Sequence, residues 1–111
     1  MKDIEIKELN IPKDQFDGRV VAFNNECIDC VELYARKNHD YGDSFHKAMN
    51  ELGMSYAVGK LFDKTNRLIA LCDKEETSKV KDESYDDTLR DLACYAIMTL
   101  AYRHYGCGDK D

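Results

Sequence analysis

The chain has 111 residues, of which 34% are charged, and its formal net charge is −6. This length suits one domain with one core, and the composition is typical of a globular protein. The acidic balance and the lack of any Lys/Arg run argue against a polymeric nucleic-acid partner, while a small nucleotide can still be held by a few cations. No segment is apolar enough to span a bilayer and no secretory signal is present, which predicts no membrane partner and a cytoplasmic location in a bacterium or a phage-infected host cell.

The first part of the chain predicts an N-terminal arm, residues 1–13, followed by a helix. The arm contains four large aliphatic residues that could form a short strand or an apolar strap over the core: Ile4, Ile6, Leu9 and Ile11. From Asp14 or Asp17, either of which can cap a helix, apolar residues recur every three or four positions. This stripe consists of Phe16, Val20, Phe23, Cys27, Val31 and Tyr34. We expect the helix to end between Lys37 and Asp40, with Gly42 supplying the turn.

Three further helices are predicted after this turn. A short one runs from Ser44 to Gly53, and a third runs from Met54 or Ser55 to Asp73. The third has a near-heptad stripe formed by Met54, Val58, Leu61, Thr65, Leu68 and Cys72, which we expect to be buried. Residues 74–84 are almost without apolar side chains and predict an exposed loop. The last helix is expected from Ser84 to near Gly106.

These elements predict an all-α fold, an antiparallel helical bundle of about four helices with a short N-terminal arm. Residues 14–108 would form a single helical domain. Bundles of this length can also pair face to face, so a homo-oligomer, a dimer or higher, is expected. The five cysteines are an odd number, which indicates free thiols, and the Cys27–Cys30 pair falls inside a helical pattern and is interpreted as packing.

Three acidic residues of the last helix form the first candidate site. Glu83, Asp87 and Asp91 are spaced i, i+4, i+8, so they stack along one side of a helix. Their mutual repulsion would be relieved by a hard divalent cation such as Mg²⁺, which prefers oxygen ligands. The alternative is a solvated face, because the helix dipole favours acids near a helix N-terminus without any further role.

Basic residues form the second candidate site. Lys60, Lys64 and Arg67 flank the apolar stripe of the third helix and could bind phosphates, with Arg67 acting as a bidentate donor. The alternative is salt bridging to the acidic last helix. In the segment 37–45, Lys37 could also contact phosphate, Tyr41 offers a ring for stacking, and Gly42 permits close backbone approach.

Three motifs occur in order along the chain: K-x-x-D-Y-G at 37–42, K-x-x-R-L at 64–68, and E-x-x-x-D-T-L-x-D-L-x-x-Y at 83–95. Over roughly residues 30–105 they resemble the nucleotide-modification-associated domain, type one, a family common in phages and bacteria. The resemblance implies an all-α domain that handles nucleotides, with kinship to the MazG-like NTP pyrophosphohydrolases, which use Mg²⁺ held by helix carboxylates. By position it assigns nucleotide binding to Lys37, Asp40, Tyr41, Gly42, Lys64, Arg67 and Tyr95. It assigns metal binding and catalysis to Glu83, Asp87 and Asp91.

The sequence departs from the MazG-like pattern on the first long helix. That pattern has E-x-x-E facing E-x-x-D on a later helix, whereas this chain has Glu26 and Glu32, which are six residues apart and diverge by about 120° around a helix. Three hypotheses follow. The chain could be a Mg²⁺-dependent pyrophosphohydrolase of a (d)NTP, with Glu26 as a further ligand. It could instead bind a nucleotide without turnover, sequestering it or a cyclic or ADP-ribose-type signalling molecule as a phage anti-defence protein. It could also be a helical bundle that only contacts other proteins.

Overall fold

The computed structural model describes residues 4–73 and 78–106, except for the side chains of 39–41, 78–80 and 82. It contains three α-helices: α1 (Gly18–Leu52), α2 (Met54–Asp73) and α3 (Ser78–Ala101). A 3-10 helix, η1 (Lys13–Gln15), precedes α1, and a π-helix, η2 (Tyr102–Gly106), continues α3. No strand occurs within the described ranges, so the predicted all-α fold is confirmed.

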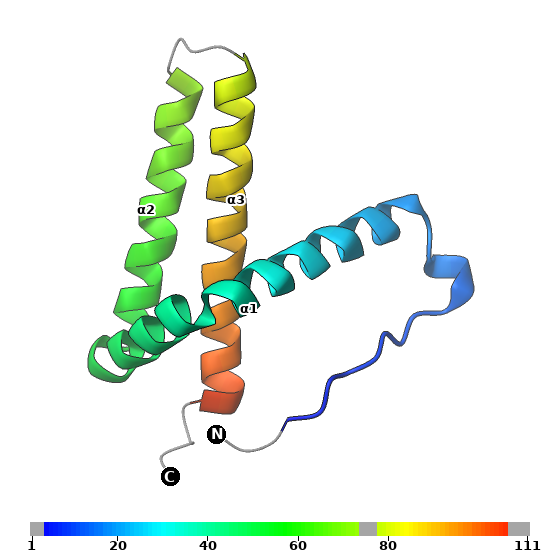
Figure 1. Ribbon diagram of the computed structural model, residues 1–111, viewed down its shortest axis with the longest axis horizontal. Helices are drawn as coiled ribbons and strands as arrows, with labels where there is room; N and C mark the ends of the chain where they lie inside the picture. Colours follow the sequence, from blue (N-terminus) through cyan, green and yellow to red (C-terminus); the bar gives the residue numbers. More distant parts are fainter. Residues whose placement is uncertain (1–3, 74–77, 107–111) are drawn as a thin grey trace.

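The helices α2 and α3 run side by side in opposite directions, and α1 crosses them at a large angle (Figure 1). The C-terminal half of α1 packs against this hairpin, while its N-terminal half projects away from it. Asp17 caps α1, since its carboxylate accepts hydrogen bonds from the backbone N–H groups of Arg19 and Val20 at 3.0 and 3.1 Å. None of the helices in the described ranges has the length and apolar character that a bilayer-spanning helix needs.

The predicted turn at residues 37–42 is wrong, because α1, which is 35 residues long, continues through this segment to Leu52. A glycine inside a helix costs only about 1 kcal/mol relative to alanine, which packing of the following turns can offset. Packing explains why position 42 is a glycine, since a Cβ there would overlap the Asn38 side chain and lie 3.2 Å from the Tyr34 hydroxyl. The chain turns at Gly53, whose φ of 67° and ψ of −153° favour glycine over any other residue.

Replacing Gly53 with alanine is expected to lower the free energy of unfolding by about 1–3 kcal/mol, because an L side chain is strained at this φ and ψ. Gly59→Ala in α2 is the matched control, since neither added Cβ would meet an atom within 4 Å and only Gly53 has a positive φ. The control should be neutral or stabilising by up to about 1 kcal/mol, because alanine favours a helix. Urea denaturation followed by circular dichroism measures both, and equal effects would contradict the role given to Gly53.

Two other predictions about the elements also differ from the structure. Residues 78–83, expected in a loop, belong to the first turns of α3, while 74–77 lie outside the described residues. The aliphatic side chains of the arm are exposed, so they do not form the expected strap over the core. On α2 the buried positions are Ala57 and Leu71, whereas Met54, Val58, Thr65 and Cys72 of the predicted stripe are exposed. The buried face of α2 is therefore rotated from the predicted one.

The core lies where α1 crosses the hairpin. Its buried residues come from all three helices: Cys30, Phe45, Met49, Ala57, Cys94 and Met98. Phe45 is central, with its ring centroid 5.8 Å from that of Tyr56 and 6.0 Å from that of Tyr95. The last turn is tied to α1 by Tyr102, whose hydroxyl donates a hydrogen bond to the Asn50 side-chain oxygen at 2.6 Å. The packing thus fixes the middle of α1 against both helices of the hairpin.

Candidate functional site: a cationic face where α1 crosses the hairpin

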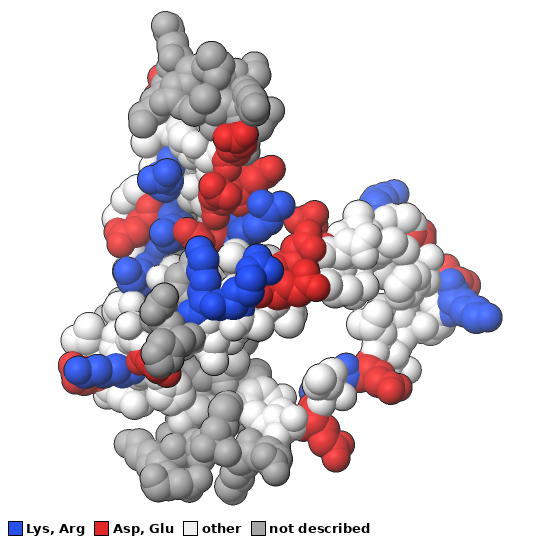
Figure 2. All heavy atoms as spheres, in the orientation of Figure 1, with Lys and Arg blue, Asp and Glu red and all other residues white. Residues whose placement is uncertain are grey.

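Basic side chains from two helices gather where α1 crosses the hairpin. Lys60, Lys64 and Arg67 succeed one another along α2, and Lys37 comes from α1, close enough to the Cys94 thiol of α3 to influence its ionisation. Figure 2 shows basic side chains clustered at this crossing. We call these four residues the cationic face. All four were candidates for phosphate binding from the sequence, and the family resemblance assigns nucleotide binding to Lys37, Lys64 and Arg67.

Two residues of α3 hold the cations of α2 in place. The Arg67 Nε–H donates to the Thr88 hydroxyl at 3.1 Å, and Lys64 Nζ lies 3.3 Å from an Asp91 carboxylate oxygen. The pairs match in register, because each helix presents its two residues three positions apart, about one turn. For Lys64, the structure therefore shows the salt bridge to the acidic last helix that the sequence analysis gave as the alternative to phosphate binding. Thr88 is 2% exposed, so its hydroxyl is a fixed anchor for the guanidinium.

Aromatic rings form the floor beneath the lysines. Lys60 Nζ lies 5.6 Å from the Tyr56 ring centroid and 5.8 Å from that of Tyr95, and Lys64 Nζ lies 5.9 Å from the Tyr95 centroid. Ammonium groups at this distance over a ring are attracted by its quadrupole. Burial raises the pKa of the Tyr95 phenol, and Tyr56 and Asp91 raise it further, so this phenol stays neutral at physiological pH.

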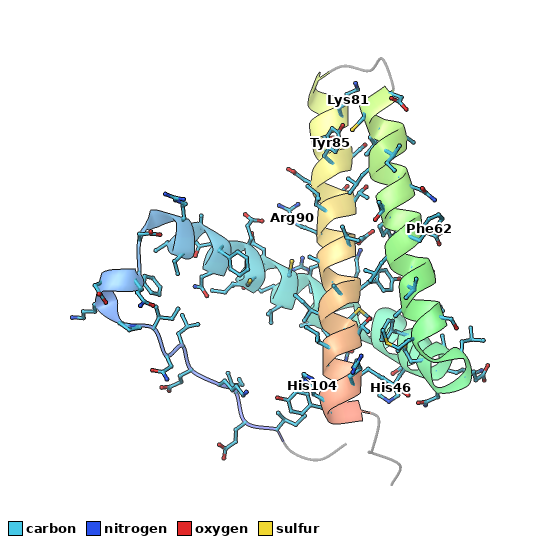
Figure 3. All side chains as sticks on the ribbon, turned by 180° about the vertical axis from the view of Figure 1, so that it is seen from behind. His46, Phe62, Lys81, Tyr85, Arg90 and His104 are labelled. Carbon is cyan, nitrogen blue, oxygen red and sulfur yellow. The ribbon has the colours of Figure 1, made fainter. Side chains whose placement is uncertain are left out.

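The carboxylate row of α3 does not assemble into a metal cage. Glu83 and Asp87 are exposed, and Asp91 is paired with Lys64. Glu26 of α1, the further ligand considered from the sequence, lies 3.6 Å from Arg90, which extends from α3 toward α1 (Figure 3). Within the part of the chain that the structure describes, no three Asp, Glu, His or Cys side chains are grouped to hold a metal ion. The described carboxylates thus form no such group as they stand, and metal binding by Glu83, Asp87 and Asp91 stays a prediction.

The remaining predicted residues lie elsewhere. Asp40 and Tyr41 have backbones in α1, but their side chains lie outside the described residues. Gly42 lies away from the cationic face and lines a cavity of about 560 Å³ between α1 and α3. His46 lines the same cavity. The His46 ring packs edge-on against Tyr102, with ring centroids 5.0 Å apart. Of the contacts in the site, sequence reasoning missed Thr88 and Tyr56, because their roles depend on the register between helices.

Two cysteines join α1 and α3 beside this cavity. The buried thiols of Cys30 and Cys94 lie close enough for Cys30 to raise the pKa of Cys94. Burial raises the pKa of Cys94 to about 11, with further contributions from Cys30 and Asp91, so this thiol is protonated at neutral pH. The interpretation of Cys30 as a packing residue, which came from the helical pattern around the pair, agrees with its burial.

A family model described as nucleotide modification associated domain 1 matches residues 37–102. The matched range includes the whole cationic face and the α3 residues that contact it. No curated protein and no solved structure gives a significant match to the chain.

Proposed function

Because the chain belongs to the nucleotide modification associated domain 1 family, we propose that its cationic face binds the phosphates of a nucleotide. The observation that carries the proposal is the row of Lys60, Lys64 and Arg67 on α2, in which Lys60 and Lys64 lie over the ring of Tyr95. Lys37 of α1 adds a further cation, near enough to Cys94 of α3 to affect the pKa of that thiol. A nucleotide presents a chain of negative charges next to a flat base, and this combination of cations and rings complements both.

The contact between Arg67 and Thr88 supports the proposed role for the guanidinium. Thr88 accepts a hydrogen bond from Nε, which leaves the terminal Nη groups on a side chain that is itself exposed. Such a guanidinium is oriented before the ligand arrives and can donate two parallel hydrogen bonds to one phosphate. Asp91 holds Lys64 in position through their ion pair. Its own negative charge would repel the phosphates and so partly offset this gain.

Release of pyrophosphate from a (d)NTP is the second candidate function, as the MazG-like resemblance implies. It is favoured by the position of Asp91, whose carboxylate adjoins the cationic face through Lys64. Magnesium would enter this proposal as part of the substrate, a Mg²⁺–nucleotide complex, because the described carboxylates do not form a site of their own.

The test is calorimetric titration and thermal shift of the full chain with nucleoside mono-, di- and triphosphates, cyclic nucleotides and ADP-ribose. A bound nucleotide at 100 times its dissociation constant should stabilise the protein by about 2.7 kcal/mol. Arg67→Ala should weaken binding by about tenfold or more, since hydrogen bonds to charged groups contribute about 1.5–3 kcal/mol. Lys47→Ala, which removes an exposed lysine of α1 outside the cationic face, is the control and should leave the affinity unchanged.

Chelation and product analysis separate the two candidate functions. Binding should persist in EDTA, because the cations that hold the phosphates belong to the protein. Chromatography of the ligand after denaturation should return an unchanged nucleotide from a binding protein, and a monophosphate with pyrophosphate from a hydrolase. If no nucleotide raises the melting temperature, or if Arg67→Ala binds as tightly as the Lys47→Ala control, the cationic face is not a nucleotide site.

A further inference from the structure

The single chain exposes far more surface than a folded protein of its mass should. Its accessible area is 8843 Å², which is about 2,500 Å² above the value expected for a monomeric globular protein of 12.8 kDa. The radius of gyration is 16.4 Å, against about 13 Å for a compact domain of this length. Part of the excess belongs to the segment before α1, whose side chains are exposed. Exposed side chains of α1, which projects from the hairpin for half of its length (Figure 1), contribute as well.

The projecting half of α1 carries large apolar side chains that stay exposed in the described chain. Their spacing of three and four residues is that of a buried helix face. Phe23 is nevertheless 74% exposed and Val31 65% exposed. Burying one large apolar side chain contributes about 1.5–3 kcal/mol, so the stripe represents several kcal/mol of stabilisation that the single chain does not obtain.

An apolar groove begins where this stripe reaches α3. The cavity of about 560 Å³ has Cys27, Val31 and Tyr34 on its α1 wall and Ile97, Met98 and Ala101 on its α3 wall. Ile97 is itself exposed, as is Leu100 on the same helix. Among the described residues that line the groove, none is Lys or Arg, so it lacks the cations that a phosphorylated ligand would need. Its surface suits an apolar helix face.

We propose that a second copy of this chain occupies the groove, with the projecting half of its α1 lying between α1 and α3 of the first copy. A two-fold axis makes the arrangement reciprocal, because each copy carries both the projecting stripe and the groove. The excess area supports this occupant. A stable interface of ordinary size needs about 800 Å² from each partner, which is about a third of the total excess, and part of that excess belongs to the segment before α1. The proposal does not depend on nucleotide binding at the cationic face.

The test is the mass of the full chain in solution by light scattering and sedimentation, with two matched variants. The native chain should have twice the 12.8 kDa mass of one copy. Phe23→Glu should halve that mass while circular dichroism remains helical, because Phe23 is exposed in the single chain. Phe62→Glu is the control, since Phe62 is 63% exposed but points from α2 away from α3 (Figure 3), and it should remain a dimer.

A second variant, Val31→Lys, and the concentration dependence of the melting temperature keep the proposal testable if Phe23→Glu fails to fold. Val31→Lys should also halve the mass, and the native melting temperature should rise with protein concentration, as mass action requires of a dimer. A monomeric native chain would overturn the proposal, whether its N-terminal arm covers the groove or the groove stays open. So would a dimer that survives both α1 variants or that only Phe62→Glu disrupts.

Discussion

Phe45→Ala should lower the free energy of unfolding by about 3–5 kcal/mol, the cost of removing a fully packed aromatic side chain and leaving a cavity. Phe45 is 4% exposed and its ring touches those of Tyr56 and Tyr95, so it joins α1 to both other helices. Small domains are stable by only about 5–15 kcal/mol, so this loss is a large part of the total. Urea denaturation followed by circular dichroism measures the change.

Phe62→Ala provides the control for this prediction, because it removes the same atoms from an exposed position on α2. Its effect should be about 0.5 kcal/mol or less, as for most surface substitutions. If the two variants are equally destabilised, the crossing of α1 over the hairpin is not the core of the protein. Phe45→Ala should also weaken nucleotide binding, since Tyr56 and Tyr95 support the lysines of the cationic face.

Reversing the charge of Lys64 should reduce nucleotide affinity by roughly 100-fold, because the variant loses one charged contact and adds a second carboxylate beside Asp91. The double variant Lys64→Asp with Asp91→Lys exchanges the two charges across the same gap of 3.3 Å. It restores both the ion pair and the net charge of the cationic face, and should recover most of the lost affinity. Calorimetric titration with the nucleotide that binds best measures both variants.

The exchanged pair also tests the second candidate function. If the chain releases pyrophosphate, the double variant should bind the nucleotide but no longer turn it over, since the carboxylate is no longer at position 91. A double variant that binds as weakly as Lys64→Asp alone would contradict a purely electrostatic role for the pair. That result would mean that Lys64 or Asp91 contacts the ligand in a way its partner cannot replace.

The fold class followed from periodicity, but the end of the first helix did not. Apolar residues at every third or fourth position predicted helices over most of the chain, and the described helices agree. At Gly42 a local preference for turns competed with the packing of Phe45 and Met49 in the same helix, and packing prevailed. The chain turns at Gly53, where the positive φ favours glycine. Both Gly42 and Gly53 were expected to end a helix, and the sequence alone does not show that only Gly53 does.

The basic residues of the candidate site were predicted from the sequence, but their contacts with α3 were not. Spacing along one helix placed Lys64 and Arg67 on a common face, and the structure keeps them there. Their partners on α3 depend on how the two helices slide against each other, which periodicity does not specify. The same limit applies to burial. Of the stripe predicted from the sequence, Phe16, Phe23 and Val31 are exposed in the described chain, while Val20, Cys27 and Tyr34 are half-buried. Only the three-dimensional arrangement reveals which of these apolar residues are covered.

The contacts of the long first helix also have a consequence for the order of folding. The thiol of Cys30 in α1 interacts with that of Cys94, and the Asn50 side chain accepts a hydrogen bond from Tyr102, so these contacts join residues that are far apart in the sequence. The helices α2 and α3 are neighbours in sequence and can pair early, since local contacts form fastest. We therefore expect the contacts between α1 and α3 to form after the hairpin. Until they form, the apolar side chains of α1 are exposed, and such transiently exposed surface favours aggregation during folding.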